Sequence, residues 1–130
     1  MLRGNHESRA MTEHFTFRSE ILQKFKDEDI YEKFIDSFEA MPIAADVNGD
    51  YLCMHGGISP ELKSKSDIDS INRFIEPPLH GFLCDLLWSD PERGVEEYGD
   101  NDRGVSFTFG ENVVKKFIAK HDLDLICRAH

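Results

Sequence analysis

Residues 43–57 read IAADVNGDYLCMHGG and contain the clearest folding signal in the chain. An Asn48-Gly49 pair separates two short apolar runs, which is the pattern of a β-hairpin with a two-residue turn. The second run leads directly into a His-Gly-Gly motif that begins at His55. We therefore expect His55 at the end of a strand, where α/β folds commonly build active sites.

Helical periodicity lies on both sides of this hairpin. Apolar residues at helical spacing predict one helix over 12–26, with Thr12 as its N-cap, and a second over 29–40. After the hairpin, the pattern predicts an amphipathic helix over 111–121 and a final short strand over 124–127. A short helix near 67–73 and a strand over 105–109 complete the expected elements. This mixture predicts an α/β (α+β) fold.

The composition is that of a globular protein and excludes some classes of function. The 130 residues are 40% hydrophobic and 31% charged, which is enough for one core of ordinary domain size. Fifteen basic and 25 acidic residues give a net charge of -10. This balance disfavours nucleic-acid binding and favours basic partners or substrates. No apolar run approaches the roughly 20 residues of a membrane span, so we expect no membrane partner.

The three cysteines, Cys53, Cys84 and Cys127, are widely spaced and each lies beside apolar residues. An odd count without a Cys-x-x-Cys pair favours neither a disulfide framework nor a zinc clamp. We expect three reduced, buried thiols and a cytoplasmic or nuclear location.

Three short motifs offer metal-ligand groups: Gly4-Asn5-His6-Glu7, His55-Gly56-Gly57 and Arg128-Ala129-His130. Amide oxygen and neutral imidazole both suit divalent ions. On the residues alone, His55 and His130 are as readily structural as metal-binding.

The chain closely resembles the phosphoprotein phosphatases, a family of metal-dependent serine/threonine phosphatases, with both calcineurin-like and type-1-like segments. Five stretches carry the resemblance in the family's order and spacing: LRGNHE (2–7), LCMHGGISP (52–60), LLWSDP (86–91), NDRGVSFTFG (101–110) and LDLICRAH (123–130). The resemblance implies a metallophosphoesterase β-sandwich flanked by helices. It also implies hydrolysis of phosphoserine and phosphothreonine monoesters on proteins by water that two metals activate.

The resemblance also assigns roles to individual residues. Asn5, His55 and His130 match three ligands of one catalytic metal, and His6 matches the histidine that protonates the leaving alkoxide. Arg103 matches a phosphate-binding arginine, and Asp90 matches a position that orients Arg103 or solvent. The implied cofactors are two divalent ions (Mn, Fe or Zn), and the implied partners are phosphoprotein substrates and regulatory subunits.

Two family motifs, Gly-Asp-x-His-Gly and Gly-Asp-x-x-Asp-Arg-Gly, are expected before residue 1 and do not occur in the chain. We therefore expect residues 1–130 to be a partial calcineurin-like metallophosphoesterase domain, without its N-terminal metal-binding segments and its C-terminal part. A central fragment of this kind is expected to be impaired in catalysis.

Several alternatives remain open at this stage. One alternative is a non-catalytic binding or regulatory module, which is a degenerate or truncated phosphatase-like protein. The other is a metallophosphoesterase that acts on phosphodiesters. Arg3 and Arg128 are expected to form structural ion pairs, and Trp88 is expected in the core. The acidic loop residues are either merely solvated or form a rim that attracts basic substrates: Glu96, Glu97, Asp100 and Asp102.

Overall fold

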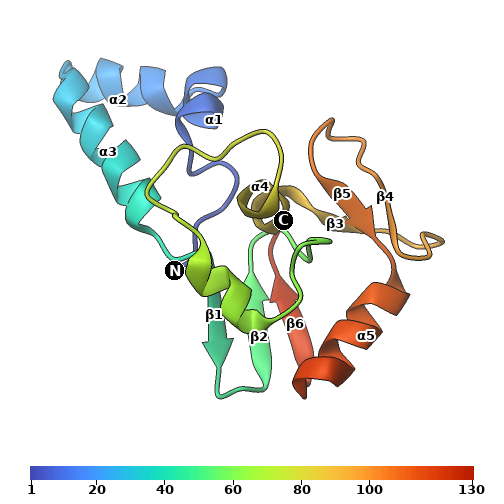
Figure 1. Ribbon diagram of the computed structural model, residues 1–130. Coiled ribbons are helices and arrows are strands. Elements are labelled where there is room, and N and C mark those ends of the chain that lie inside the picture. Colours follow the sequence, from blue (N-terminus) through green and yellow to red (C-terminus); the bar gives the residue numbers. More distant parts are fainter.

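The computed structural model describes residues 1–130, and its centre is a three-stranded sheet (Figure 1). Strands β1 (Ala44–Val47) and β2 (Tyr51–Met54) form an antiparallel hairpin, and β2 pairs in parallel with β6 (Leu125–Arg128). At the turn, Asn48 and Gly49 have φ values of 60° and 83°. This left-handed backbone is what a two-residue hairpin turn requires, so the hairpin prediction is confirmed.

A second small sheet lies beside the first, in the order β3-β5-β4. Strand β5 (Phe107–Phe109) pairs in parallel with β3 (Asp90–Pro91) and antiparallel with β4 (Tyr98–Asp100). Helix α5 (Glu111–His121) then leads from β5 towards β6, as predicted. Strands β3 and β4 were not predicted, because their two or three residues include Pro91 and Gly99. The predicted α/β class is confirmed, with two small mixed sheets.

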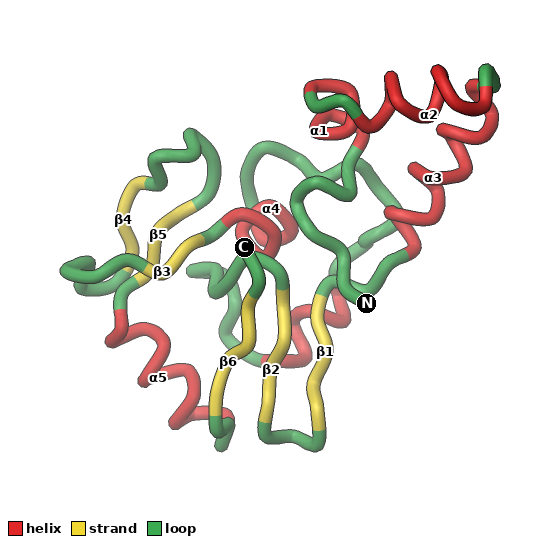
Figure 2. Tube along the Cα trace, turned by 180° about the vertical axis from the view of Figure 1, so that it is seen from behind, coloured by secondary structure: helices red, strands yellow, loops and turns green.

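Three helices project from one side of the central sheet (Figures 1 and 2). They are α1 (Arg9–His14), α2 (Phe17–Phe25) and α3 (Glu28–Ala40). The prediction of a single helix over 12–26 is wrong, because the backbone becomes extended at Phe15 and separates α1 from α2.

The expected N-cap at Thr12 is also wrong, because α1 begins earlier. Ser8 caps α1 by accepting a hydrogen bond from Met11 N, and Thr12 lies inside the helix. The Thr12 hydroxyl is 2.8 Å from the buried Tyr31 hydroxyl of α3. Thr12 therefore joins two helices instead of starting one, and the helix predicted over 29–40 is confirmed as α3.

The main core lies between the central sheet and the helices α4 (Phe82–Trp88) and α5. Leu52 and Met54 of β2 contribute from the sheet, and Leu86 and Leu87 of α4 are fully buried. The short helix near 67–73 is found as a 3-10 helix, η1 (Lys65–Ser70), and starts with a Ser64 capping box. A smaller apolar cluster holds α2 against α3. The core therefore fixes α4, whose end leads directly into β3.

The segment before α1 is held by polar contacts with the loop after η1. Buried Arg3 donates from Nη1 to Arg73 O at 2.8 Å and to Ile75 O at 3.0 Å. In return, the Glu76 carboxylate accepts hydrogen bonds from the Arg9 and Ala10 backbone N–H groups at 2.8 and 2.9 Å. Helix starts leave such N–H groups without intrahelical partners. These contacts fix the residues that include Asn5 and His6.

The cysteines are free, as expected, but only Cys84 is buried. Cys127 is exposed and Cys53 is half-buried, since both lie on the face of the central sheet away from Leu52 and Met54. The expectation of three buried thiols is therefore wrong for these two. None of the helices is long and apolar enough to cross a membrane.

The thiols should differ sharply in reactivity. Burial raises the pKa of Cys84 to about 11, and the neighbouring Asp85 charge adds to the effect. Since the thiolate is the nucleophile, we expect native Cys84 to react with iodoacetamide about a hundredfold more slowly than an ordinary thiol. Cys127 should react readily, and peptide mass spectrometry can follow both rates. Equal rates in the native protein would contradict this assignment.

Candidate metal centre

His55 and His130 lie side by side because their strands are parallel neighbours. Met54 of β2 is in register with Arg128 of β6, so both strands end at the same edge of the sheet. Backbone hydrogen bonding between the two segments continues past the strand ends, where the His130 N–H donates to His55 O at 3.0 Å. The two imidazole rings are 4.9 Å apart between centroids.

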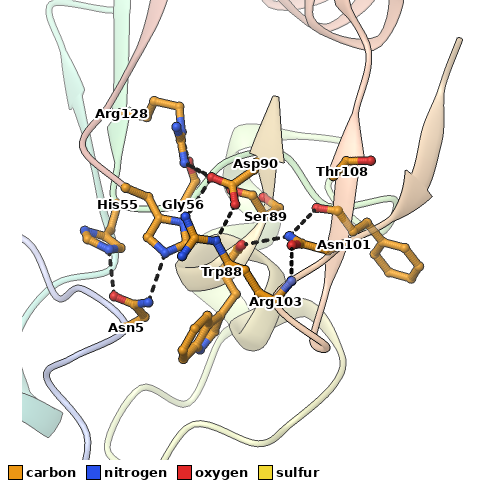
Figure 3. A network of polar contacts seen from close by, with 12 residues as sticks. Asn5, His55, Gly56, Trp88, Ser89, Asp90, Asn101, Arg103, Thr108 and Arg128 are labelled. Carbon is orange, nitrogen blue, oxygen red and sulfur yellow. Dashed lines mark hydrogen bonds and ion pairs between the residues drawn. The ribbon is translucent and has the colours of Figure 1, made fainter. Parts of the chain in front are cut away.

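The Asn5 side chain bridges these two rings by hydrogen bonds, and Figure 3 shows its contact with His55. Its Nδ2 donates to His130 Nε2 at 3.0 Å, and its Oδ1 accepts from His55 Nε2 at 2.9 Å. Asn5 is buried, and the His130 side chain is only 6% exposed. The structure thus brings together all three predicted ligands of one metal, from three separate segments.

Both imidazoles are held in the form that binds metals. Burial lowers the pKa of His55 and of His130 below the ordinary value, and for His130 it outweighs the opposing effect of Asp90. This lowering favours the neutral ring at pH 7, and a neutral ring offers a lone pair. His130 Nδ1 is buried without a hydrogen-bond partner, although Asp90 Oδ1 lies 3.2 Å away.

The donor set fits one side of a divalent metal site. It combines an amide oxygen with two imidazole nitrogens, and one buried ring nitrogen of His130 lacks a hydrogen bond. Such donors suit Mn, Fe or Zn. Nowhere in the structure do three or more His, Cys, Asp or Glu side chains converge as a metal cluster. Asn5, His55 and His130 are therefore candidate ligands for one side of a metal site.

Glycines next to the ligands allow the close approach. A Cβ at Gly4 would lie 2.6 Å from Glu7 Oε2 and 2.9 Å from His55 Nδ1. A Cβ at Gly56 would lie 2.7 Å from the backbone at the end of α4. Gly4 and Gly56 therefore have a steric role beside His55.

Asp90 is the centre of an ionic network beside the ligands (Figure 3). Its Oδ1 accepts from Arg128 Nη2 at 2.6 Å and its Oδ2 accepts from Arg103 Nε at 2.5 Å. Burial opposes ionisation of Asp90, but Arg103, His130 and Arg128 together outweigh it and lower the pKa of the carboxyl. Asp90 thus joins the predicted phosphate-binding arginine to a predicted metal ligand.

The loop that carries Arg103 is folded by a neighbouring side chain that the sequence analysis did not single out. Asn101 Oδ1 accepts from the Arg103 backbone N–H at 2.9 Å. Asn101 Nδ2 donates to Trp88 O and Phe107 O, both at 3.3 Å. The Asn-Asp sequence at 101–102 is typical of such turns and was the available signal. The Nη atoms of Arg103 make no hydrogen bond within the chain.

Arg103 and Asp90 line a polar hollow of about 390 Å³. The larger hollow, about 980 Å³, lies between residues 92–96 and the start of α5 and contains none of the predicted site residues. Hydrogen-bonding and charged groups, and not cavity size, therefore identify the candidate site.

The remaining sequence predictions have mixed outcomes. His6 follows Asn5 but is exposed, and its ring stacks on Phe15 with centroids 5.0 Å apart. Arg128 forms the expected ion pair, whereas Arg3 forms none and bonds instead to backbone carbonyls. Trp88 contacts the core as expected and also meets His130 edge-on.

In the acidic loop, Glu97 pairs with Lys116 at 3.0 Å. Its neighbours Glu96, Asp100 and Asp102 form no ion pair, so the charge of this loop is largely uncompensated.

Substitution of Gly4 by alanine should displace ligands without unfolding the protein. The new Cβ would push on the movable ends of Glu7 and His55. We expect Mn²⁺ binding to weaken about tenfold, as is usual when the supports of metal ligands are changed. Calorimetric titration of Gly4→Ala with Mn²⁺ measures this effect.

The matched control is Gly49→Ala in the distant hairpin turn. No atom lies within 4 Å of a Cβ there, but φ is +83°, so the substitution should lower stability and leave Mn²⁺ affinity unchanged. Equal Mn²⁺ affinity in Gly4→Ala and the unsubstituted protein would refute the steric argument.

Acidification should destabilise the metal-free protein through the two candidate ligands. The folded-state pKa of His55 and His130 is lowered from the ordinary 6.5, so the unfolded chain binds protons more readily. This contribution is fully present above pH 6.5 and is lost as the pH falls through 6.5 towards the folded-state values. Urea unfolding in chelator at several pH values measures the loss. His130→Gln should flatten the dependence, and an unchanged slope would contradict the assignment.

Comparisons with known proteins identify the family of this chain. The profile of the calcineurin-like phosphoesterases matches residues 1–130. A serine/threonine protein phosphatase from Saccharomyces cerevisiae, described as similar to human phosphatase PP5, is 37% identical, and its solved structure superposes with a TM-score of 0.89. The match covers 98% of this chain and 39% of the yeast chain. These matches show that the chain belongs to the calcineurin-like phosphoesterase family.

Proposed function

We propose that residues 1–130 provide the Asn5, His55 and His130 part of a two-metal site that hydrolyses phosphoserine and phosphothreonine monoesters on proteins. The observation that carries the proposal is the position of Asp90, which contacts both Arg103 and His130. A group that binds phosphate and a group that binds metal thereby meet at one carboxylate. The family and the similarity to a protein phosphatase support this substrate class.

Arg103 is proposed to bind the phosphoryl group. Its Nε is held by Asp90, and its Nη atoms have no partner within the chain. A guanidinium offers several N–H donors in one plane and matches phosphate oxygens better than a single ammonium does. Asp90 therefore fixes the orientation of the Arg103 guanidinium, while the Nη donors of Arg103 remain available to the substrate.

His6 is proposed to donate a proton to the serine or threonine oxygen as it leaves. It is exposed next to the buried ligand Asn5, and stacking on Phe15 limits the orientations of its ring. An alkoxide is a poor leaving group, so a positioned acid of this kind typically contributes roughly 10²–10⁴-fold.

Asn5, His55 and His130 would hold one ion, of Mn, Fe or Zn. When bound, a metal pair in such a site lowers the pKa of a water and so supplies the nucleophile. In this proposal the remaining ligands come from segments beyond residues 1–130, and the partners are phosphoprotein substrates and regulatory subunits. A non-catalytic role is the alternative, because no cluster of three or more His, Cys, Asp or Glu side chains that could hold a metal is found in the structure.

A phosphatase assay with Mn²⁺ tests the proposal. We expect turnover of a phosphoserine peptide, and little of a bis-aryl phosphodiester, by a protein in which the family's flanking segments extend residues 1–130 at both ends. His6→Gln should lower kcat by roughly 10²–10⁴-fold, and Arg103→Ala should mainly weaken phosphate binding. Arg18→Ala, which changes a half-buried arginine on α2 that pairs with Glu28, is the control.

The 130-residue chain alone should show no robust turnover in the same assay. Robust turnover by it would contradict the need for further ligands. Binding of partners without any turnover by the extended protein would instead support the non-catalytic alternative.

A further inference from the structure

A buried carboxylate, Asp85, lies beneath the loop that carries Arg103. Asp85 is on α4 and is only 1% exposed. Ser59 Oγ donates to Asp85 Oδ2 at 2.6 Å, and Ser106 Oγ donates to Asp85 Oδ1 at 2.8 Å. No basic side chain forms an ion pair with it. A carboxylate this deep needs such hydrogen bonds to replace lost water, so the two serines are held firmly.

The three bonded residues come from three of the segments that build the site. Ser59 follows the His-Gly-Gly turn that contains His55, and Ser106 follows Arg103 by three positions. Asp85 itself is one helical turn before the residues that lead to Asp90. A single side chain therefore joins the metal-ligand turn, the arginine loop and the helix that presents Asp90.

The backbone at Ser106 shows what this contact does for the arginine loop. Ser106 has φ of 61° and Gly104 has φ of 76°. The left-handed region is unfavourable for a residue with a Cβ and persists where surrounding contacts hold it. The Ser106–Asp85 hydrogen bond is such a contact. It fixes the C-terminal end of the loop, while Asn101 fixes the N-terminal end through Trp88 O.

We propose that Asp85 is a positioning residue that holds Arg103 ready to bind phosphate, and that it acts through the Ser106 hydroxyl. The proposal rests on the proposed function, in which Arg103 binds the phosphoryl group. Asp85 does not touch the substrate, since it is covered by the loop that it holds.

Binding of inorganic phosphate to the extended, Mn²⁺-loaded protein tests the proposal by calorimetry. Ser106→Ala should weaken phosphate binding about tenfold, as expected when a binding group is misplaced. If Ser106 acts through Arg103, then Ser106→Ala combined with Arg103→Ala should bind phosphate no more weakly than Arg103→Ala alone. A merely structural role would not produce this dependence.

Two further variants separate positioning from folding. Ser106→Gly removes the hydroxyl but favours the left-handed backbone, so it should fold normally and still bind phosphate weakly. Asp85→Asn keeps the shape and can still exchange hydrogen bonds with rotating hydroxyls, so it should retain phosphate binding that Asp85→Ala loses. Ser37→Ala, an exposed serine on α3, is the control.

The outcomes distinguish the two proposals. If Arg103→Ala does not weaken phosphate binding, the proposed function of Arg103 is wrong. If Arg103→Ala does weaken phosphate binding but Ser106→Gly binds phosphate as tightly as the unsubstituted protein, the positioning role of Asp85 is wrong. Additive effects of Ser106→Ala and Arg103→Ala would also overturn it.

Discussion

The parallel pairing of β2 with β6 is the contact on which the candidate site depends. It joins residues about 75 positions apart in the sequence, and its register places Met54 beside Arg128. Parallel strands end at the same edge, so the residues that follow the two strands meet. The His55 carbonyl oxygen accepts hydrogen bonds from the backbone N–H groups of Ala129 and His130. A slip by one residue would turn the side chains of β6 to the opposite face and separate the two imidazoles.

Two carboxylates then fix the charged groups around this pair, and they do so differently. Asp90 is partly exposed, forms ion pairs with Arg103 and Arg128, and contacts His130, so it holds charged side chains in place. Asp85 is buried and its carboxylate accepts hydrogen bonds only from the Ser59 and Ser106 hydroxyls, so it holds the backbone of the segments that carry these serines. Both belong to one continuous stretch, α4 followed by β3, which the fully buried Leu86 and Leu87 hold in the core. The packing of α4 in the core thus sets the positions of Asp85 and Asp90.

Much of this was predictable where the signal is local. The hairpin, α3, α5 and the final strand follow from turn chemistry and from hydrophobic periodicity. The division of the first helical region was missed because Phe15 has no breaker residue beside it and the periodicity continues across it. Strands β3 and β4 were missed because two or three residues carry no periodicity, and their pairing depends on β5. Burial of Cys127 was predicted from its apolar neighbours, but alternation along β6 places it on the open face.

The sequence by itself determined the family and identified the candidate metal ligands and the candidate phosphate-binding arginine. Its short motifs record local steric needs, such as the lack of room for a Cβ at Gly4 and Gly56. Only the tertiary structure decided that Asn5 lies between two imidazoles, that Asp90 joins Arg103 to His130, and that Asp85 lies beneath Ser106. The physical reason is distance along the chain. These contacts link segments separated by 13 to 125 residues, and such pairs meet only after strand pairing and core packing have fixed the backbone.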